Sequence, residues 1–527
     1  MSRIIAFYKK VMYNTCGDSM FAKVNSMGLY GIDAYTIEVE ADISSGLPGF
    51  DIVGLPDAAV KESRDRVRAA IKNAGYKFPL GKIIVNLAPA DVRKEGSIYD
   101  LPIMLAILSA SGQIKADVSK SIFIGEVSLD GKLRRVNGIL AMAIKAAQSG
   151  FENFYMPLEN AGEGAYIDAI KSFGIDTAES LLKHLKNEIE IKPAIKPQSA
   201  KNSATFELDF SEVRGQAVAK RALEVAAAGG HNILLIGPPG SGKSMLAKRF
   251  PTILPEMTFE ESLNTTKIHS IAGVLNPESP MVTVRPFRSP HHTVSAAGLT
   301  GGGAMPKPGE ISLAHNGVLF LDELPEFNRD VMEAMRQPLE DGKITISRAA
   351  ASFTYPADFT LIAAMNPCPC GYFGHPAHKC TCTAKNVSKY LGKISGPLLD
   401  RLDLHIEVPP VEYNALCSND VEESSEVIRS RVNVARKIQT ERYKGTGITC
   451  NARLTPTLLK KYCVLTPDAS ALLKTSFDTL GLSARAYDRL LKVARTIADL
   501  EGKQNIEVPH VAQAIQFRSL DRKYWGE

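Results

Sequence analysis

Apolar and polar positions along the first third of the chain predict a mixture of strands and helices. Residues 35–43 and 82–88 place an apolar side chain at nearly every second position, which is the period of a half-buried strand. Residues 58–75 have helical apolar spacing and end on Gly75, a residue that suits a helix C-terminus. Residues 101–112 are apolar almost throughout, so we expect a buried helix there.

The same alternation continues up to a polar stretch that predicts a domain boundary. Residues 121–128 have the pattern of a strand, and residues 138–150 have that of a helix. Residues 188–206 contain two Lys-Pro pairs followed by small polar residues, and nothing in them could form a core. We therefore expect an α+β domain over residues 20–187 and a linker over 188–206.

Residues 207–412 have a different pattern, in which continuous apolar runs are separated by longer polar segments. Runs of this kind are typical of parallel strands buried on both faces by helices. The four predicted strands span residues 231–237, 317–324, 359–367 and 402–409. Residues 413–527 are helical in pattern, most clearly at 483–502. The expected fold class is therefore α/β for the core, with a helical domain after it.

Composition sets limits on this picture. A chain of 527 residues is too long for one hydrophobic core, and about 150 residues per domain predicts three domains. The net charge of +5 permits a nucleic-acid partner without requiring one. No apolar run reaches membrane-spanning length, and the N-terminus lacks the pattern of a secretory signal, so we expect a cytoplasmic protein with no membrane partner.

A phosphate-binding loop follows the first predicted strand of the core. It matches G-x-x-x-x-G-K-[ST] and consists of Gly237, Pro238, Pro239, Gly240, Ser241, Gly242, Lys243 and Ser244. The glycines let backbone N–H groups surround the phosphates of ATP, Lys243 reaches the β- and γ-phosphates, and the Ser244 hydroxyl binds Mg²⁺. The residues after the loop begin a helix whose N-terminus favours the anion.

Polar residues end two further strands of the core. Asp322 and Glu323 follow the apolar run that begins at Gly317, at the sheet edge where ligands of parallel sheets bind. We expect Asp322 to hold Mg²⁺ and Glu323 to act as general base on the attacking water. Asn366 ends the next strand and could position that water or contact the γ-phosphate, although an Asn at a strand end also forms turns.

These three strand ends, in this order, are similar to those of the AAA+ ATPase family. The resemblance implies further roles for two arginines. Arg401 stands where the family has an arginine finger that acts on the ATP of a neighbouring subunit, and Arg485 stands where it has a second-sensor arginine at the start of a lid helix. A fixed cation stabilises the charge that phosphoryl transfer spreads over oxygens. A finger acting on a neighbour implies a ring.

Longer motifs narrow the resemblance. The stretches RPFRSPHHTVSAAGLTGGGAMPKPGE, NPCPCGYFGHP and GLPGFDIVGLPDAAVKESRDRVRAAI resemble the YifB/ComM family of Mg-chelatase-like AAA+ ATPases, and the likeness extends from residue 20 onward. ComM-type members are hexameric motors that promote DNA branch migration during natural transformation. The resemblance thus implies single-stranded or branched DNA and further copies of this chain as partners. A chelatase-type remodeller of a protein partner is the alternative. Residues 1–19 resemble an extension before the family's natural start.

Residues 20–187 resemble the proteolytic domain of Lon, also found in the RadA branch-migration protein. Lon cuts peptide bonds with a Ser–Lys dyad. Asp100 aligns with the serine position (Ile98 without a gap), and Leu140 aligns with the lysine position, although Ser97 lies close by. We therefore expect an S5-like domain without protease activity, which serves as a scaffold or as a second DNA surface.

Four cysteines lie close together in the loop at residues 366–382. Cys368 and Cys370 form one pair, and Cys380 and Cys382 form the other. Four thiolates on one short loop suit tetrahedral zinc, and a group of reduced, unbound cysteines is the alternative. We expect a structural Zn²⁺ ion.

Two segments occupy positions in the AAA+ frame where a motor could contact DNA. One is the Gly-rich insert with Lys307, and the other is a hairpin with Lys343 and Arg348. Basic side chains bind phosphate without reading sequence. The alternative is that the glycines only form turns and that the charges are solvated.

Overall fold

The computed structural model describes residues 20–197, 206–303, 306–347, 352–375, 377–411, 422–480 and 483–525, and these residues form two compact units. The first unit contains the described residues up to 197 together with Thr266–Met281. The second contains the described residues from 206 to 265 and from 282 onward. The boundary near residue 201 falls within the predicted linker. Residues 1–19, predicted to be an extension, lie outside the described part of the chain.

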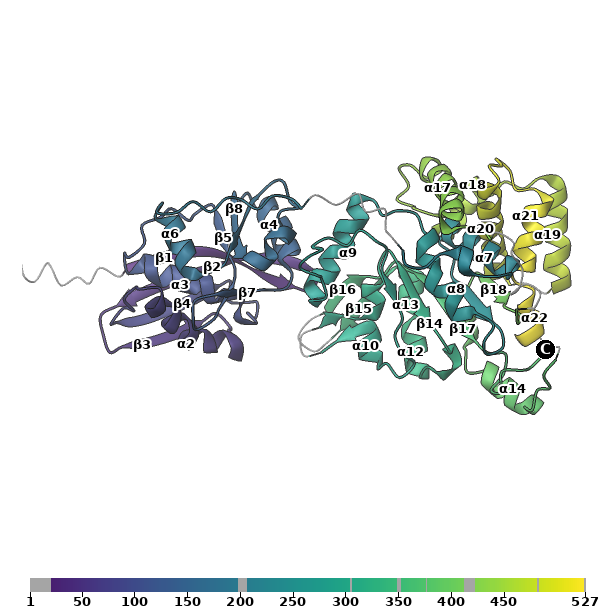
Figure 1. Cartoon of the computed structure of the whole chain (residues 1–527), viewed down its shortest axis with the longest axis horizontal. Helices are drawn as coiled ribbons and strands as arrows, with labels where there is room; N and C mark the ends of the chain where they lie inside the picture. Colours follow the sequence, from purple (N-terminus) through teal and green to yellow (C-terminus); the bar gives the residue numbers. More distant parts are fainter. Residues whose placement is uncertain are drawn as a thin grey trace, which may run out of the picture. The chain divides into compact units, whose positions relative to one another are not determined.

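The first unit is built on a seven-stranded mixed sheet with the order β3-β4-β2-β1-β5-β8-β9 (Figure 1). β1 and β2 pair antiparallel over their whole lengths, whereas β5, β8 and β9 are parallel to one another. The strands are β1 (Met20–Tyr30), β2 (Asp33–Ser44), β3 (Gly49–Val53), β4 (Lys82–Ala88), β5 (Ser121–Phe123), β8 (Asn153–Pro157) and β9 (Lys171–Ile175), with a short ribbon of β6 (Glu126–Val127) and β7 (Leu133–Arg134) beside them. The predicted strand at 121–128 is therefore two short strands with different partners.

Helices bury this sheet in two apolar clusters. The helices are α2 (Ala58–Asn73), α3 (Asp100–Ala110), α4 (Ile139–Gln148), α5 (Ala161–Gly164) and α6 (Ala178–Leu185). α2, α3 and α6 share one cluster with the alternating apolar side chains of β2, while α4 shares the other with β5 and β8. α3 is buried almost all round, which explains why its sequence is apolar without helical periodicity. The predicted helices at 58–75, 101–112 and 138–150 are confirmed.

Asp100 and Leu140 stand at the two positions that the sequence aligns with the Ser–Lys dyad of Lon. Asp100 begins α3 with a fully buried side chain, and it accepts hydrogen bonds from the Arg66 guanidinium at 2.7 and 3.1 Å. Burial raises the pKa of Asp100, and the hydrogen bonds from Arg66 oppose that rise. Leu140 is buried on α4. Ser97 donates a hydrogen bond to the carboxylate of Glu126.

The second unit contains a five-stranded parallel sheet with the order β11-β14-β17-β10-β18. Its strands are β11 (Phe287–Arg288), β14 (Val318–Leu321), β17 (Thr360–Met365), β10 (Ile233–Ile236) and β18 (Leu404–Glu407). Every residue of β10, β14 and β17 is buried, as the continuous apolar runs predict. The predicted parallel sheet is confirmed. β10, the strand that precedes the predicted phosphate loop, lies between β17 and β18.

Helices pack on this sheet and continue into a C-terminal bundle. Those of the core are α7 (Ala217–Gly229), α8 (Lys243–Arg249), α9 (Phe259–Ala272), α10 (Ala296–Thr300), α11 (Glu310–Leu313), α12 (Arg329–Ala334), α13 (Arg336–Asp341), α14 (Ala384–Leu391) and α15 (Gly396–Leu399). Those of the bundle are α17 (Ser425–Arg442), α18 (Pro456–Tyr462), α19 (Pro467–Leu480), α20 (Ala484–Leu500), α21 (Val508–Gln516) and α22 (Leu520–Trp525). α17 and α20 pack on α7, so bundle and core share one apolar cluster (Figure 1).

We expect Asp100→Ala to lower the free energy of unfolding by about 3 kcal/mol, because Arg66 would keep a largely buried charge without its carboxylate partner. Calorimetry of the full chain should show an unfolding transition at a lower temperature. Glu152→Ala, which breaks an exposed ion pair with Lys120 in the same unit, is the control and should leave the transition in place. Equal shifts in the two variants would contradict a stabilising role for the Arg66–Asp100 pair.

Candidate functional site

The predicted phosphate loop joins the end of β10 to the start of α8. Gly240 and Gly242 have φ angles of 76° and 93°, the left-handed region that favours glycine. At Gly237 a Cβ atom would lie 2.2 Å from the Val408 carbonyl oxygen, so any side chain there would collide with the backbone after β18. The loop conformation therefore requires glycine at these three positions.

Lys243 is held inside the loop. Its Nζ donates hydrogen bonds to the carbonyl oxygens of Gly237 and Pro238 at 2.7 and 2.9 Å, and to Asn366 Oδ1 at 3.2 Å. The residue is 8% exposed. Burial lowers the pKa of Lys243 to about 8, although the charges of Asp322 and Glu323 oppose the shift. The ammonium is thus held at the phosphate loop by hydrogen bonds to oxygen atoms that phosphate oxygens could replace.

The neighbouring strands bring the predicted partners to the same edge. Ser244 Oγ donates to Asp322 Oδ2 at 2.6 Å, so the two oxygens expected at Mg²⁺ lie together. Asn366 directly follows β17, which is paired with β10 so that Met365 lies opposite Ile236. The carboxyl ends of three adjacent parallel strands therefore assemble Lys243, Asp322 and Asn366 as the sequence predicts.

Glu323 lies at this edge with a backbone φ of 52°, which is unusual for a residue with a side chain. Its side chain is 56% exposed, and its Oε2 lies 3.5 Å from His292 Nδ1. His292 in turn packs edge-on against the ring of Phe327. No sequence motif indicated the contact with His292, because His292 follows β11 and Glu323 follows β14, two strands that are paired in the sheet but far apart in the sequence.

Gln216 is a second residue of the loop's surroundings that no sequence motif indicated. It has a φ of 57°, and its Nε2 donates to the carbonyl oxygens of Pro409 at 2.7 Å and Ser241 at 3.3 Å. It lines a cavity of about 550 Å³, together with residues 215, 217, 218, 405–407, 409–411, 516, 517, 519 and 520. This cavity is large enough for a nucleotide base.

Arg401 and Arg485 lie together, away from the phosphate loop of their own chain. Both line a cavity of about 340 Å³ that also contains Asn232, the residue before β10. The phosphate loop begins at the other end of β10, about 16 Å away at about 3.3 Å per residue. The two arginines therefore occupy the opposite edge of the sheet from Lys243.

The cavity with the two arginines has a net positive lining, in which five cations face the carboxylates of Glu340, Asp400 and Asp403. Arg401 forms an ion pair with Glu340, and Arg485, with a side chain 68% exposed, lies 3.9 Å from Asp400. Arg453, Arg489 and Lys492 add three more cations that sequence reasoning did not single out. Burial lowers the pKa of Arg489 and of Lys492, and nearby carboxylates oppose the shift. The excess of cations over carboxylates favours an anion at this cavity.

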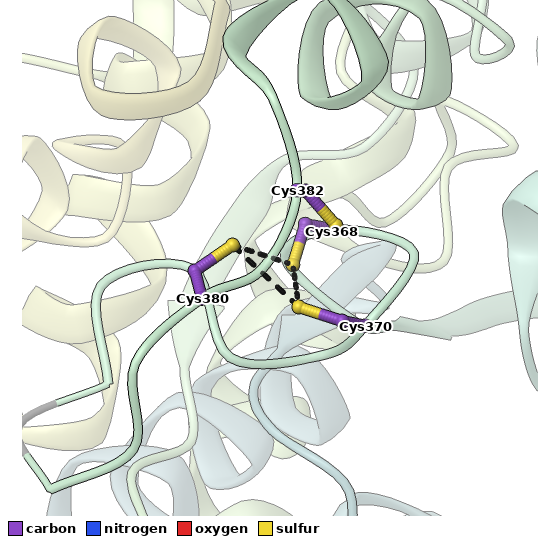
Figure 2. A group of neighbouring side chains, drawn as sticks. All are labelled: Cys368, Cys370, Cys380 and Cys382. Atoms are coloured by element: carbon purple, nitrogen blue, oxygen red, sulfur yellow. Dashed lines mark hydrogen bonds between the residues drawn. The ribbon is translucent and has the colours of Figure 1, made fainter.

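The four predicted cysteine ligands also converge. Cys368, Cys370 and Cys380 have Sγ–Sγ distances of 3.4 to 3.7 Å, and the sulfur atoms of all four cysteines lie within 4.8 Å of one another (Figure 2). Backbone N–H groups, first that of Tyr372, lower the pKa of Cys370 to about 5. The backbone N–H of Cys382 lowers the pKa of Cys380. Burial and the adjacent thiols raise that pKa by more, so the pKa is about 12. A bound cation would remove this mutual penalty.

The two segments predicted to contact DNA are neighbours in the structure. β15 (Lys343–Ser347) pairs with β16 (Ser352–Pro356), which confirms the predicted hairpin, and β12 (Gly301–Gly302) pairs with β13 (Lys307–Pro308). Tyr355 Oη donates to the Pro306 carbonyl oxygen at 2.7 Å, so the hairpins touch. Lys307 and Lys343 are exposed. Arg348 lies outside the described residues.

A parallel sheet in which β10, between β17 and β18, leads into a glycine-rich phosphate loop, with Asp322 and Asn366 at the same edge, defines a P-loop ATPase of the α/β class. Family models match in three places. The model of magnesium chelatase, subunit ChlI, matches residues 209–416, that of subunit ChlI of Mg-chelatase matches residues 39–160, and that of the subunit ChlI C-terminal region matches residues 422–518.

Relatives of similar length cover nearly the whole chain. The chain is 45% identical over 503 residues to the uncharacterized protein YifB of Salmonella typhimurium, covering 95% of this chain and 97% of that one. It is 44% identical over 507 residues to the competence protein ComM of Haemophilus influenzae, covering 95% and 98%. A magnesium-chelatase 67 kDa subunit of Chlorobaculum tepidum is 30% identical over 164 residues, 30% of this chain and 23% of that protein. The chain therefore belongs to the YifB/ComM family of magnesium-chelatase-like AAA+ ATPases.

Membership of this family implies a bound nucleotide with Mg²⁺. The residues at the loop fit both ligands, since Lys243 faces the phosphate position and the Ser244 and Asp322 oxygens are 2.6 Å apart. None of the helices in the described part of the chain has the length and apolar character that a membrane span requires.

We expect ATP binding to weaken as the pH rises above 8. The pKa of Lys243 is about 8, so the amine is charged at pH 7 and increasingly neutral at pH 9. Phosphate binds the charged form, so above pH 8 binding must take up a proton, and the dissociation constant should rise toward about tenfold per pH unit. Titrations with a fluorescent nucleotide at pH 7, 8 and 9 measure this.

Lys243→Arg is the control for the pH series, because a guanidinium stays charged throughout this range. Whatever its affinity, the variant should lack the rise between pH 8 and 9. A wild-type dissociation constant that is the same at pH 7 and pH 9 would contradict the titration of Lys243 in this range.

Proposed function

We propose that this protein is an ATP-hydrolysing ring motor that acts on single-stranded or branched DNA and promotes branch migration and strand integration during natural transformation. The likeness to the competence protein ComM over 95% of the chain supports this role. The observation that carries the ring is the position of Arg401 and Arg485 at the sheet edge opposite the phosphate loop.

Each residue at the loop has a role in hydrolysis under this proposal. Lys243 binds the β- and γ-phosphates, while Ser244 and Asp322 hold Mg²⁺. Glu323 accepts a proton from the attacking water, and its exposure leaves room for that water. Asn366 contacts the γ-phosphate once the ammonium of Lys243, now 3.2 Å from its Oδ1, turns to the nucleotide.

Arg401 and Arg485 act on the nucleotide of the neighbouring subunit. Within one chain they lie about 16 Å of strand away from the loop, too far to reach its γ-phosphate. A head-to-tail ring, which we propose to be a hexamer, would place this basic edge against the next subunit's loop. The carboxylate of Glu340 holds Arg401 until the anion of the neighbour replaces it.

Mixed rings test this division of the site. Arg401→Ala should lower the turnover number at least a hundredfold with nucleotide affinity nearly unchanged, as expected for an arginine finger. Glu323→Gln should be equally inactive. Co-assembly of the two variants should restore activity at about a quarter of the interfaces, since those combine an intact Glu323 with a neighbour's intact Arg401. Mixtures as inactive as either variant alone would contradict catalysis across the interface.

The two touching hairpins are the proposed DNA contacts. Lys307 and Lys343 are exposed on strands linked by the Tyr355–Pro306 hydrogen bond. Arg348, which lies outside the described residues, is proposed with them from its position in the sequence between β15 and β16. Cations at these positions bind phosphates without reading base sequence.

Stimulation of ATP turnover by branched DNA tests the DNA role. We expect the double variant Lys307→Ala and Lys343→Ala to lose most of that stimulation, and its DNA affinity to depend less steeply on salt because fewer phosphates are neutralised. Lys437→Ala, at an exposed position of α17, is the matched control and should behave as the wild type. If neither branched nor single-stranded DNA binds the wild type or stimulates it, the DNA role fails.

A chelatase-type motor that remodels a protein partner is the second candidate. It is favoured by the three matches to models of a magnesium chelatase subunit. The two candidates share the nucleotide site and differ in what stimulates it, so the DNA experiment above separates them.

Three smaller assignments complete the proposal. The first unit is an S5-like, Lon-type domain that serves as a scaffold without cutting peptide bonds, because aspartate and leucine stand at the dyad positions. The four clustered cysteines bind a structural Zn²⁺ ion. The protein works in the cytoplasm, where its thiols stay reduced.

A further inference from the structure

The cysteine loop begins beside the nucleotide site. Cys368 follows Asn366 by two residues, and Asn366 contacts Lys243 at 3.2 Å. Cys368 is fully buried, and its Sγ accepts a hydrogen bond from the Phe373 backbone N–H at 3.3 Å. The segment from Cys368 to Phe373 thus forms a turn, directly after the end of β17, that is closed by a hydrogen bond to the sulfur atom of Cys368.

The loop then packs directly on the phosphate loop. A Cβ atom on Gly371 would lie 2.5 Å from Pro239 Cδ, so the backbone of Gly371 is in close contact with that proline. Beyond it, Phe373 and His375 line a cavity of about 300 Å³ together with Gly237 and Pro238. Anything that moves this segment therefore changes the wall of the phosphate loop.

Apart from the four sulfur atoms, the segment is held by surface contacts, such as that of the Phe373 ring with the Tyr524 ring at 6.3 Å between centroids. Between Tyr372 and Cys382 no described residue is buried, and the segment contains neither helix nor strand. Four thiolates at about 2.3 Å from a zinc ion would lie about 3.8 Å apart, close to the 3.4 to 3.7 Å found here. His375 Nδ1 accepts hydrogen bonds from the N–H groups of Ala377 and His378. Among the described residues of this segment, the possible ligand atoms that converge are the four sulfur atoms, all within 4.8 Å of one another.

We propose that a zinc ion held by Cys368, Cys370, Cys380 and Cys382 clamps Gly371 against Pro239, so that the affinity for ATP depends on this metal. The inference rests on the proposed nucleotide role of the phosphate loop and is independent of DNA. The metal supplies the cross-link that the exposed segment cannot obtain from apolar burial. It takes no part in hydrolysis, because all four of its positions are filled by protein ligands.

Metal analysis and nucleotide titration of the full-length protein test the two halves of this proposal. The wild type should contain one zinc ion per chain. Cys370→Ser and Cys382→Ser should lose zinc and bind a fluorescent ATP analogue at least tenfold more weakly, with circular dichroism showing that the chain remains folded. His378→Ala should keep both the metal and the affinity.

Two glycine variants separate the clamp from the metal. Gly371→Ala should keep its zinc but bind nucleotide several-fold more weakly, because the new methyl group collides with Pro239. Gly374→Ala is the matched control, since its φ of 77° resembles the 84° of Gly371 but its Cβ would meet no atom within 4 Å. It should keep both properties.

Each outcome decides a separate point. A wild type without zinc would overturn the metal site. Zinc-free cysteine variants and a Gly371→Ala variant that all bind nucleotide like the wild type would overturn the clamp and leave a purely structural metal. A wild type that contains zinc but binds no nucleotide would instead contradict the proposed role of the phosphate loop.

Discussion

The parallel pairing of β10 with β17, and of β17 with β14, is the constraint on which the nucleotide site depends. Parallel strands all end at one edge, so residues about 80 and 120 positions apart in the sequence become neighbours there. Lys243, Asp322 and Asn366 need no long-range signal of their own to meet. Each of them comes after one of three adjacent strands, and this alone brings them to the same edge. The strands are recognisable in the sequence because burial on both faces requires continuous apolar runs.

The same constraint places the cavity lined by Arg401 and Arg485 at the opposite edge of the sheet from the phosphate loop of its own chain. Asn232 lies before β10 and lines the cavity with Arg401 and Arg485, whereas the phosphate loop follows β10. The arginines of the cavity and the phosphate loop therefore lie at opposite ends of β10, separated by the length of that strand. Under the proposed function, the sheet carries the phosphate loop at one edge and the arginines that act on a neighbour's ATP at the other. ATP turnover would therefore depend on assembly of the subunits.

Sequence reasoning went furthest where a residue's role follows from the backbone next to it. The phosphate loop, the strand ends at Asp322 and Asn366, and the cysteine pairs all carry a local pattern, and the structure brings each group together. His292, Gln216 and the cations around Arg401 carry none, because they meet their partners only through strand order. The single strand predicted at 121–128 was wrong in detail for the same reason. β5 pairs with β1 and β6 pairs with β7, and the local alternation of apolar residues does not determine which strands pair.

Two loops meet at Pro239 and Gly371, and they are held by opposite means. The phosphate loop is fixed by its backbone, through left-handed glycines, a buried lysine that bonds its carbonyl oxygens, and a helix that starts at its end. The described residues of the cysteine loop form turns but neither helix nor strand, and between Tyr372 and Cys382 none of them is buried, so a cross-link would replace apolar packing. Contact with the cysteine loop can constrain the phosphate loop only if the cysteine loop is itself constrained. Close contact at Gly371 is therefore physically consistent with a cysteine loop that is itself tied down, and the four sulfur atoms are the groups in this segment positioned to do so.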